Sequence, residues 1–191
     1  LSDEKATRDL IPRATAALGR ISCLVNSASL FDYDDASSFT IAKLDEHMHA
    51  NVAGPVILAQ ALHQSTPEGA QAVVINLLDQ KLFNLNPDFL SYTLSKAALQ
   101  TATTLLAQAL APKLRVVGLA PGLTLVSGDQ TEEGFAKAHR QTPLGKSSSP
   151  ADIAGAACFL ASATAITGTV LTVDGGQHLT PLNRDVMFLA K

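Results

Sequence analysis

The stretch of sequence that decides the fold begins with AQAVVINLL (residues 70–78) and ends with LRVVGLAPG (residues 114–122). Both runs are short, apolar and rich in β-branched residues, which favour strands. Between them, residues 91–111 are rich in alanine and leucine, which favour a helix. Strands that are apolar on both faces are typical of a parallel sheet covered by helices on both sides. The stretch therefore predicts a strand–helix–strand unit.

The same alternation extends toward both ends of the chain. Further strands are expected at residues 21–28 and 169–173, and further helices at residues 2–18, 43–64, 132–140 and 150–161. Ser2 is the expected cap of the first helix and Gly19 its end, and Gly54-Pro55 is expected to kink or interrupt the second. The pattern predicts a doubly wound, Rossmann-like α/β fold in which residues 1–191 form a single domain.

A glycine-rich turn normally holds the pyrophosphate of a dinucleotide in such folds, between the first strand and the first helix. No GxGxxG-like element precedes the first helix in this sequence. We therefore expect residues 1–191 to lack the N-terminal strands and glycine-rich turn that form the nucleotide-binding segment.

Composition argues against several classes of partner. The 191 residues carry a net charge of −3 with no block of like charges, so no nucleic-acid or membrane partner is indicated. Cys23 and Cys158 each lie in an apolar run, so we expect two buried thiols in a reducing cytoplasm. Their spacing, and that of the histidines, predicts no metal site.

The clearest candidate for chemistry is the pair Tyr92 and Lys96. Residues four apart on a helix lie on the same face. A Tyr hydroxyl titrates near pH 10, and a nearby ammonium is expected to lower that pKa by stabilising the phenolate. By itself this spacing is common between unrelated surface neighbours.

Short motifs around this pair occur in a fixed order along the chain. They are Asn26-Ser27-Ala28, Asn51-Val52-Ala53-Gly54-Pro55, Tyr92-Thr93-Leu94-Ser95-Lys96, Pro121-Gly122-Leu123 and Asp174-Gly175-Gly176. Their order and spacing resemble those of the short-chain dehydrogenase/reductase family along essentially the whole chain. The resemblance implies a nicotinamide cofactor, NADP with NAD as the alternative, and a homo-tetramer or homo-dimer.

The resemblance also implies roles for individual residues. Tyr92 matches the general acid, Lys96 the residue that binds the nicotinamide ribose, and Asn51 the asparagine of the proton relay. The positions that match cofactor contacts are Asn26, Ala28, Lys96, Pro121, Gly122 and Leu123.

One position departs from the usual pattern of the family. Asp79 stands thirteen residues before Tyr92, where most members place a catalytic serine. With an aspartate at this position, the sequence resembles pteridine reductases and dihydromonapterin reductases. The resemblance implies that Ser29 and Phe31 match the residues that hydrogen-bond to the pterin and stack on it. A buried carboxyl with a raised pKa can orient or supply a proton, and we expect Asp79 and Tyr92 to titrate as a coupled pair.

These features predict an NADPH-dependent reductase of a pterin-like small molecule, such as a dihydropterin or dihydrofolate. A carbonyl or alcohol oxidoreductase of unknown substrate is the second interpretation. An enoyl reductase is less favoured, because that branch spaces its Tyr and Lys further apart. The third interpretation is a non-catalytic member of the family that serves as a binding or scaffold protein, as the missing glycine-rich turn suggests.

Overall fold

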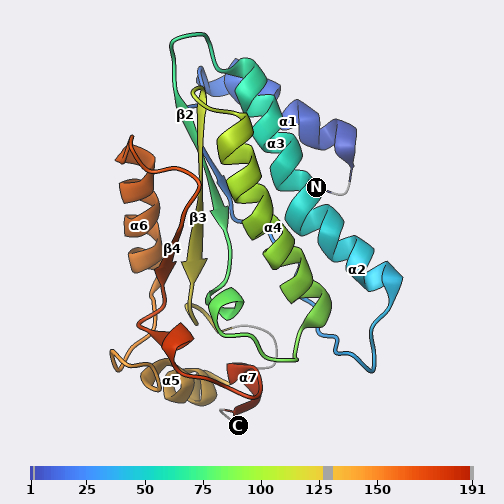
Figure 1. The fold of residues 1–191 in the computed structure, drawn as a ribbon, viewed down its shortest axis with the longest axis vertical. Helices are drawn as coiled ribbons and strands as arrows, with labels where there is room; N and C mark the ends of the chain where they lie inside the picture. The colour runs from blue at the N-terminus through green and yellow to red at the C-terminus, as the bar shows by residue number, and fades with distance from the viewer. Residues whose placement is uncertain (2, 127–130, 190–191) are drawn as a thin grey trace.

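Four parallel strands form one sheet in the computed structural model, which describes residues 1, 3–126 and 131–189 (Figure 1). The strands are β1 (Cys23–Asn26), β2 (Ala72–Leu77), β3 (Leu114–Pro121) and β4 (Val170–Val173). They lie side by side in chain order. Asn26 is in register with Asn76, and Pro121 with Val173, so the carboxyl ends of neighbouring strands meet at one edge of the sheet.

Helices cover both faces of this sheet (Figure 1). The α-helices are α1 (Glu4–Leu18), α2 (Ile41–Met48), α3 (Gly54–Ser65), α4 (Leu90–Ala109), α5 (Glu132–Arg140), α6 (Pro150–Ser162) and α7 (Val186–Leu189). Helices α3 and α4 pack on one face with α1 outside α3, and α6 packs on the other. Helices α5 and α7 lie beyond the carboxyl ends of the strands.

The core follows from the apolar strands. Val74 and Val116 point into a cluster with α1 and α3, whereas Ile75 and Val117 point toward Leu160 of α6. Alternate residues of one strand therefore enter two different cores, as a sheet covered on both faces requires. The predicted doubly wound α/β fold is confirmed.

The segment predicted as one kinked helix at residues 43–64 is three helical elements. Helix α2 ends at Met48, the π-helix η1 covers His49–Ala53, and α3 begins at Gly54. Pro55 lies in the first turn of α3, where its missing N–H costs little. The interruption therefore precedes the proline, and the π-turn absorbs it.

The start of the first helix differs in detail from the prediction. Ser2 lies outside the described residues. The observed cap is Asp3, whose Oδ1 accepts a hydrogen bond from the Ala6 N–H at 2.8 Å. Gly19 ends the helix with a φ of 82°, as expected.

The prediction of two buried thiols is wrong, because Cys23 and Cys158 are both exposed, and both are free. In the described chain β1 is an edge strand, and Val25 on the same face as Cys23 is exposed too. Cys158 lies beside the exposed Phe159, whereas the neighbouring Leu160 is buried against the sheet. Both cysteines therefore stand on the outer sides of apolar elements.

Arg115 is a charged residue inside a strand that the sequence suggested to be apolar on both faces. It is 5% exposed, and its guanidinium donates to the carbonyl oxygens of Leu160, Ala161 and Ile166. Two of these carbonyls belong to the last turn of α6, which has no intrahelical partner for them. Arg115 thus closes the end of α6 against the sheet.

No helix among the described residues is long and apolar enough to cross a membrane.

Candidate active site

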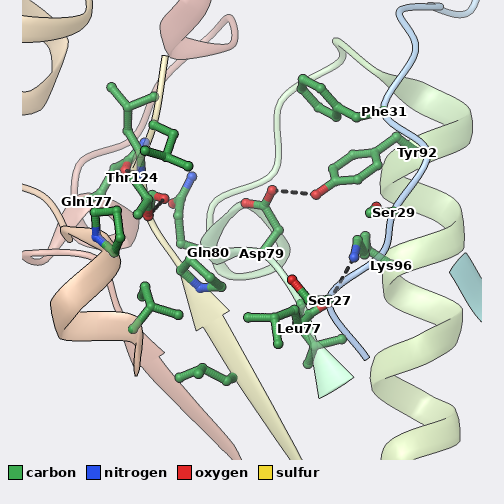
Figure 2. Close-up of a pocket in the computed structure, with 18 of the residues that line it drawn as sticks. Ser27, Ser29, Phe31, Leu77, Asp79, Gln80, Tyr92, Lys96, Thr124 and Gln177 are labelled. Atoms are coloured by element: carbon green, nitrogen blue, oxygen red, sulfur yellow. Dashed lines mark hydrogen bonds between the residues drawn. The ribbon is translucent and has the colours of Figure 1, made fainter. Parts of the chain in front are cut away.

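A cavity of about 580 Å³ opens at the carboxyl ends of β2 and β3, between α4 on one side and α6 on the other (Figure 2). In folds of this kind, ligands bind outside the carboxyl ends of the strands. The predicted site residues that line this cavity are Ser29, Phe31, Asp79, Tyr92, Lys96, Pro121, Gly122 and Leu123.

Asp79 and Tyr92 form a direct hydrogen bond in the cavity (Figure 2). Tyr92 lies in the first turn of α4 and is 6% exposed, and its hydroxyl donates to Asp79 Oδ2 at 2.8 Å. Asp79 follows β2 and caps the short 3-10 helix η2 (Gln80–Phe83), because its Oδ1 accepts the Lys81 N–H at 2.8 Å. Both carboxylate oxygens are thus held in place.

The environment raises the pKa of both groups. Burial raises the pKa of the Asp79 carboxyl, even though it accepts hydrogen bonds from Lys81 and Tyr92. Burial, and then the charge of Asp79, raise the pKa of Tyr92 well above its usual value. The pair therefore holds protons to higher pH than the isolated groups, and the two side chains titrate together.

Lys96 lies one turn along α4 from Tyr92 but does not contact its hydroxyl. Its Nζ donates to the Leu77 carbonyl oxygen at 2.8 Å and lies 5.7 Å from the centre of the Tyr92 ring. Burial lowers the pKa of Lys96 to about 8. The expectation that Lys96 lowers the pKa of Tyr92 is wrong in this structure, because burial and the neighbouring carboxylates Asp79 and Asp185 raise that pKa.

Asn51 lies in the π-helix η1 and is 1% exposed. Its amide donates to the Leu30 carbonyl at 3.0 Å and to Ser95 Oγ at 2.9 Å. Its Oδ1 accepts from the Leu30 N–H at 2.7 Å and the Ser29 hydroxyl at 3.2 Å. The side chain joins the loop after β1 to α4 and does not line the cavity.

Asn26 is buried at the end of β1, and its amide donates to Asn76 Oδ1 at 2.8 Å. The Asn76 amide in turn donates to Thr103 Oγ1 of α4 at 2.9 Å. This buried chain ties β1, β2 and α4 together beneath the site. Ala28 is exposed in the loop beyond it, between the lining residues Ser27 and Ser29.

Pro121 ends β3, Gly122 and Leu123 follow it, and all three line the cavity. A Cβ on Gly122 would lie 2.6 Å from Ser147 Oγ and 2.8 Å from the Asp174 Cα, so no side chain fits there. The Leu123 N–H donates to Gln177 Oε1 at 2.9 Å. Glycine at this position lets the segment pack closely on the loop after β4.

Phe31 lies above Tyr92 and already has an aromatic partner. Its ring stacks on Phe89 with centroids 4.3 Å apart, and its centroid is 4.7 Å from that of Tyr92 in an edge-on arrangement. The Ser29 hydroxyl, below it, donates to Asn51. One face of Phe31 is therefore covered by the protein, although the ring remains 37% exposed.

The sequence reasoning missed several lining residues. They are Val25, Ser27, Leu77, Leu78, Gln80, Leu119, Thr124, Leu125, Pro150, Ile153, Ala154, Ala157, Gln177, Asp185, Val186 and Met187. Gln80 carries a buried Oε1 without a hydrogen-bond partner in the described chain. It adjoins Asp79, and Gln177 adjoins the Asp-Gly-Gly motif, so proximity to a motif could have found both. No motif marks residues 185–187.

The chemistry of the cavity fits a nicotinamide cofactor. Lys96 uses one of its three donors on Leu77, so two remain for a ribose hydroxyl. The apolar side chains of Ile153, Ala154 and Ala157 face the cavity from α6 and can cover a flat ring. Within the described residues, no group of three or more His, Cys, Asp or Glu residues could hold a metal ion.

Known proteins are similar to this chain in sequence and fold. The family model described as enoyl-(acyl carrier protein) reductase matches residues 1–178. The chain is 33% identical over 184 residues to an uncharacterized oxidoreductase of Methylorubrum extorquens, covering 92% of this chain and 73% of that one. It is 29% identical to a 2-dehydro-3-deoxy-D-gluconate 5-dehydrogenase of Dickeya dadantii, again over 92% and 73%.

A solved structure is more similar still in sequence. FolM alternative dihydrofolate reductase 1 of Brucella suis, solved in complex with NADP, superposes with a TM-score of 0.90 and 40% identity. The match covers 95% of this chain and 74% of that one.

Proposed function

Because the chain belongs to the short-chain dehydrogenase/reductase family, we propose that this oxidoreductase reduces a pterin-like substrate, such as a dihydropterin or dihydrofolate, with NADPH. The observation that carries the proposal is the hydrogen bond between Tyr92 and Asp79 inside the cavity. The similarity to a FolM alternative dihydrofolate reductase solved with NADP supports it.

Asp79 and Tyr92 are suited to deliver a proton to a ring nitrogen. Reduction of a C=N bond adds a hydride to carbon and a proton to nitrogen, and the bound nicotinamide cofactor supplies the hydride. The raised pKa values mean that the pair holds its protons to higher pH than the isolated groups do. Asp79 holds the Tyr92 hydroxyl in a fixed direction, and the partly exposed ring of Phe31 offers an apolar surface to a flat substrate.

The roles proposed for the other residues follow from their positions. Lys96 would bind the cofactor ribose, and Pro121, Gly122 and Leu123 would lie against the nicotinamide. Asn26 and Asn51 would act by positioning the loops and α4, because their amides are engaged within the protein.

The test is NADPH oxidation by the full-length protein with a panel of substrates: dihydrobiopterin, dihydromonapterin, dihydrofolate, simple ketones and an enoyl thioester. We expect turnover of at least one dihydropterin or dihydrofolate and little turnover of ketones. Turnover of ketones without turnover of pterins contradicts the proposal and favours a carbonyl reductase. Calorimetry that detects no NADPH binding would favour a non-catalytic binding protein.

A substitution at Asp79 gives a matched comparison. Asp79→Ser places a neutral hydroxyl where most relatives of this family carry one, so ketone reduction should rise while pterin reduction falls. Asp35→Ser is the control, because Asp35 is a half-exposed loop carboxylate bound to Ser37 and Ser38 and does not line the cavity. If Asp79→Ser leaves the ratio of pterin to ketone turnover unchanged, Asp79 does not select the substrate.

A further inference from the structure

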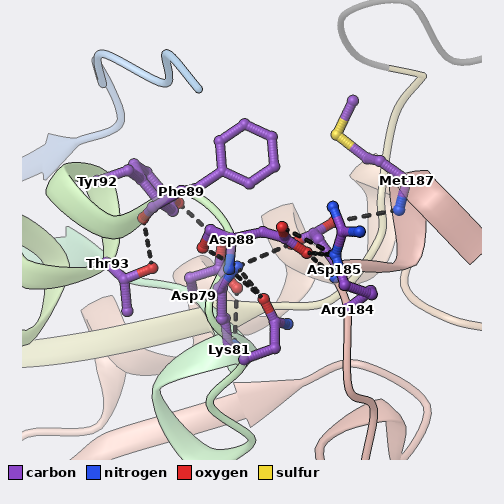
Figure 3. Close-up of polar contacts among 10 residues, drawn as sticks. Asp79, Lys81, Asp88, Phe89, Tyr92, Thr93, Arg184, Asp185 and Met187 are labelled. Atoms are coloured by element: carbon purple, nitrogen blue, oxygen red, sulfur yellow. Dashed lines mark hydrogen bonds and ion pairs between the residues drawn. The ribbon is translucent and has the colours of Figure 1, made fainter. Parts of the chain in front are cut away.

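Residues 184–187 lie against the candidate site although they are about a hundred residues from it in the chain (Figure 3). Asp185, Val186 and Met187 line the same cavity as Asp79 and Tyr92. Val186 begins α7, a helix of four residues that is too short to be stable without outside contacts. Contacts with another segment must therefore hold these residues in place.

Two ion pairs join this segment to the loop between β2 and α4 (Figure 3). Lys81 Nζ lies 3.0 Å from Asp185 Oδ2. Arg184 Nε donates to both oxygens of Asp88, at 3.0 and 2.8 Å. The Asp185 N–H also donates to Asp88 Oδ2 at 2.7 Å, so backbone and side chains are fixed together.

Burial makes these pairs sensitive to the loss of a partner. Lys81 and Asp88 are each 2% exposed, and a buried charge is costly unless it is paired and hydrogen-bonded. Lys81 uses all three donors, on Asn86 Oδ1, the Asp88 carbonyl oxygen and Asp185 Oδ2. The third acceptor, Asp185 Oδ2, comes from the segment at residues 184–187. This segment therefore supplies the negative charge that pairs with the buried Lys81 of the loop.

The same loop contacts the candidate catalytic pair. The backbone N–H of Lys81 donates to Asp79 Oδ1, while its side chain holds Asp185. Phe89 follows Asp88 and stacks on Phe31, which lies edge-on to Tyr92. The position of residues 185–187 is therefore defined relative to the reacting groups.

We propose that the Lys81–Asp185 and Asp88–Arg184 ion pairs position Asp185, Val186 and Met187 as one wall of the substrate cavity. These pairs determine substrate affinity without touching a reacting atom. The inference rests on the proposed function, because it takes the cavity beside Asp79 as the substrate site. Lys81, Asp88 and Arg184 are positioning residues, and we expect their substitution to change the KM of the substrate.

The test is Arg184→Gln in the full-length protein, which changes the half-exposed partner of the pair and leaves Asp88 with the Asp185 N–H as a donor. We expect the KM of the reduced substrate to rise about tenfold, since charge-assisted hydrogen bonds are the strong ones. The kcat and the KM of NADPH should change less than about twofold. Arg184→Lys keeps the positive charge but loses the planar guanidinium, whose Nε bonds both oxygens of Asp88. The substrate KM of this variant should therefore lie between those of wild type and Arg184→Gln. Lys113→Gln, which breaks the distant pair with Glu68, is the control and should change neither constant.

Hydrogen–deuterium exchange gives a readout that needs no turnover. The Asp185 and Met187 N–H groups donate to Asp88 and Asp185, so peptides over residues 184–189 should exchange faster in Arg184→Gln, and peptides from α1 should not. Unchanged exchange overturns the proposal, and so does faster exchange with an unchanged substrate KM. A wild-type protein that reduces ketones but no pterin contradicts the proposed function alone. The ratio of the variant KM to the wild-type KM for the ketone then still tests whether the ion pairs position residues 185–187.

Discussion

The two sides of the candidate cavity are held in place by different interactions. The helix wall, formed by Tyr92 and Lys96 of α4 with Asp79 after β2, is fixed by hydrogen bonds between neighbouring core elements. The anchored wall, formed by Asp185, Val186 and Met187, is fixed by ion pairs to a loop. The first wall holds the groups that can move a proton. The second shapes the space beside them, and the charge of Asp185 adds to the effects that raise the pKa of Asp79 and Tyr92. Changes in the helix wall should therefore appear in kcat, and changes in the anchored wall in KM.

The largest effect is expected when the helix wall loses its proton donor but keeps its shape. Tyr92→Phe removes the hydroxyl that donates to Asp79 and keeps the buried ring. Loss of a positioned proton donor typically costs about 10²–10⁴-fold in rate, so kcat should fall by that factor. The KM of the substrate should change by less than about threefold. Steady-state kinetics with saturating NADPH measure both constants. A large rise in KM with an unchanged kcat would show that Tyr92 serves binding, as the anchored wall does.

The next effect concerns Phe89, which connects the two walls. Its ring is 4% exposed and stacks on Phe31 and Phe188, and its backbone has a φ of 56°, which is strained for a residue with a Cβ. Phe89→Ala loses the ring and keeps the strain, so it should lower the free energy of unfolding by about 3 kcal/mol. Phe89→Gly loses the ring but relieves the strain, so it should be about 1 kcal/mol more stable than Phe89→Ala.

Urea unfolding of the two Phe89 variants measures this difference directly. If alanine and glycine are equally destabilising, the left-handed backbone at residue 89 stores no strain. Phe89 itself would then connect the two walls through aromatic packing alone.

The sequence predicts a wall well when its interacting residues are close together in the chain, and poorly when they are far apart. Tyr92 and Lys96 share a helix, so periodicity placed them on one face, and Asp79 follows a strand whose apolar pattern was plain. The interactions of the anchored wall join residues about a hundred positions apart. No spacing rule connects Lys81 to Asp185, and Asp88 and Arg184 look like ordinary loop charges. The exposure of Cys23 was missed for a related reason, because an apolar run does not show which faces of a strand are covered.

A smaller effect sharpens the role of Asp79 within the helix wall. Because burial raises the pKa of Asp79, the pair with Tyr92 keeps a proton at higher pH than an ordinary carboxyl does. The kcat/KM for the pterin should fall as pH rises through the apparent pKa of this pair. The Asn side chain of Asp79→Asn stays neutral, so the kcat/KM of this variant should not show that decrease with rising pH. Its rate should be about 10–100-fold lower than that of wild type at the optimum pH. A wild-type profile and an Asp79→Asn profile of the same shape would mean that Asp79 does not titrate in the reaction.

The smallest effect is a dependence of stability on pH that comes from Lys96. Burial lowers its pKa from 10.5 to about 8 in the folded protein. Between these values the unfolded chain binds more protons than the folded one, so the free energy of unfolding rises with pH, by about 1 kcal/mol per pH unit. Stability from this group is fully present above the unfolded pKa and is lost as pH falls through the folded pKa. Lys96→Met should lack this slope between pH 8 and 10, while Lys81→Met should retain it. Urea unfolding at several pH values distinguishes the two. A slope that persists in Lys96→Met would mean that the Lys96 ammonium is not destabilised by its place in the helix wall, and that its partner Leu77 compensates for burial.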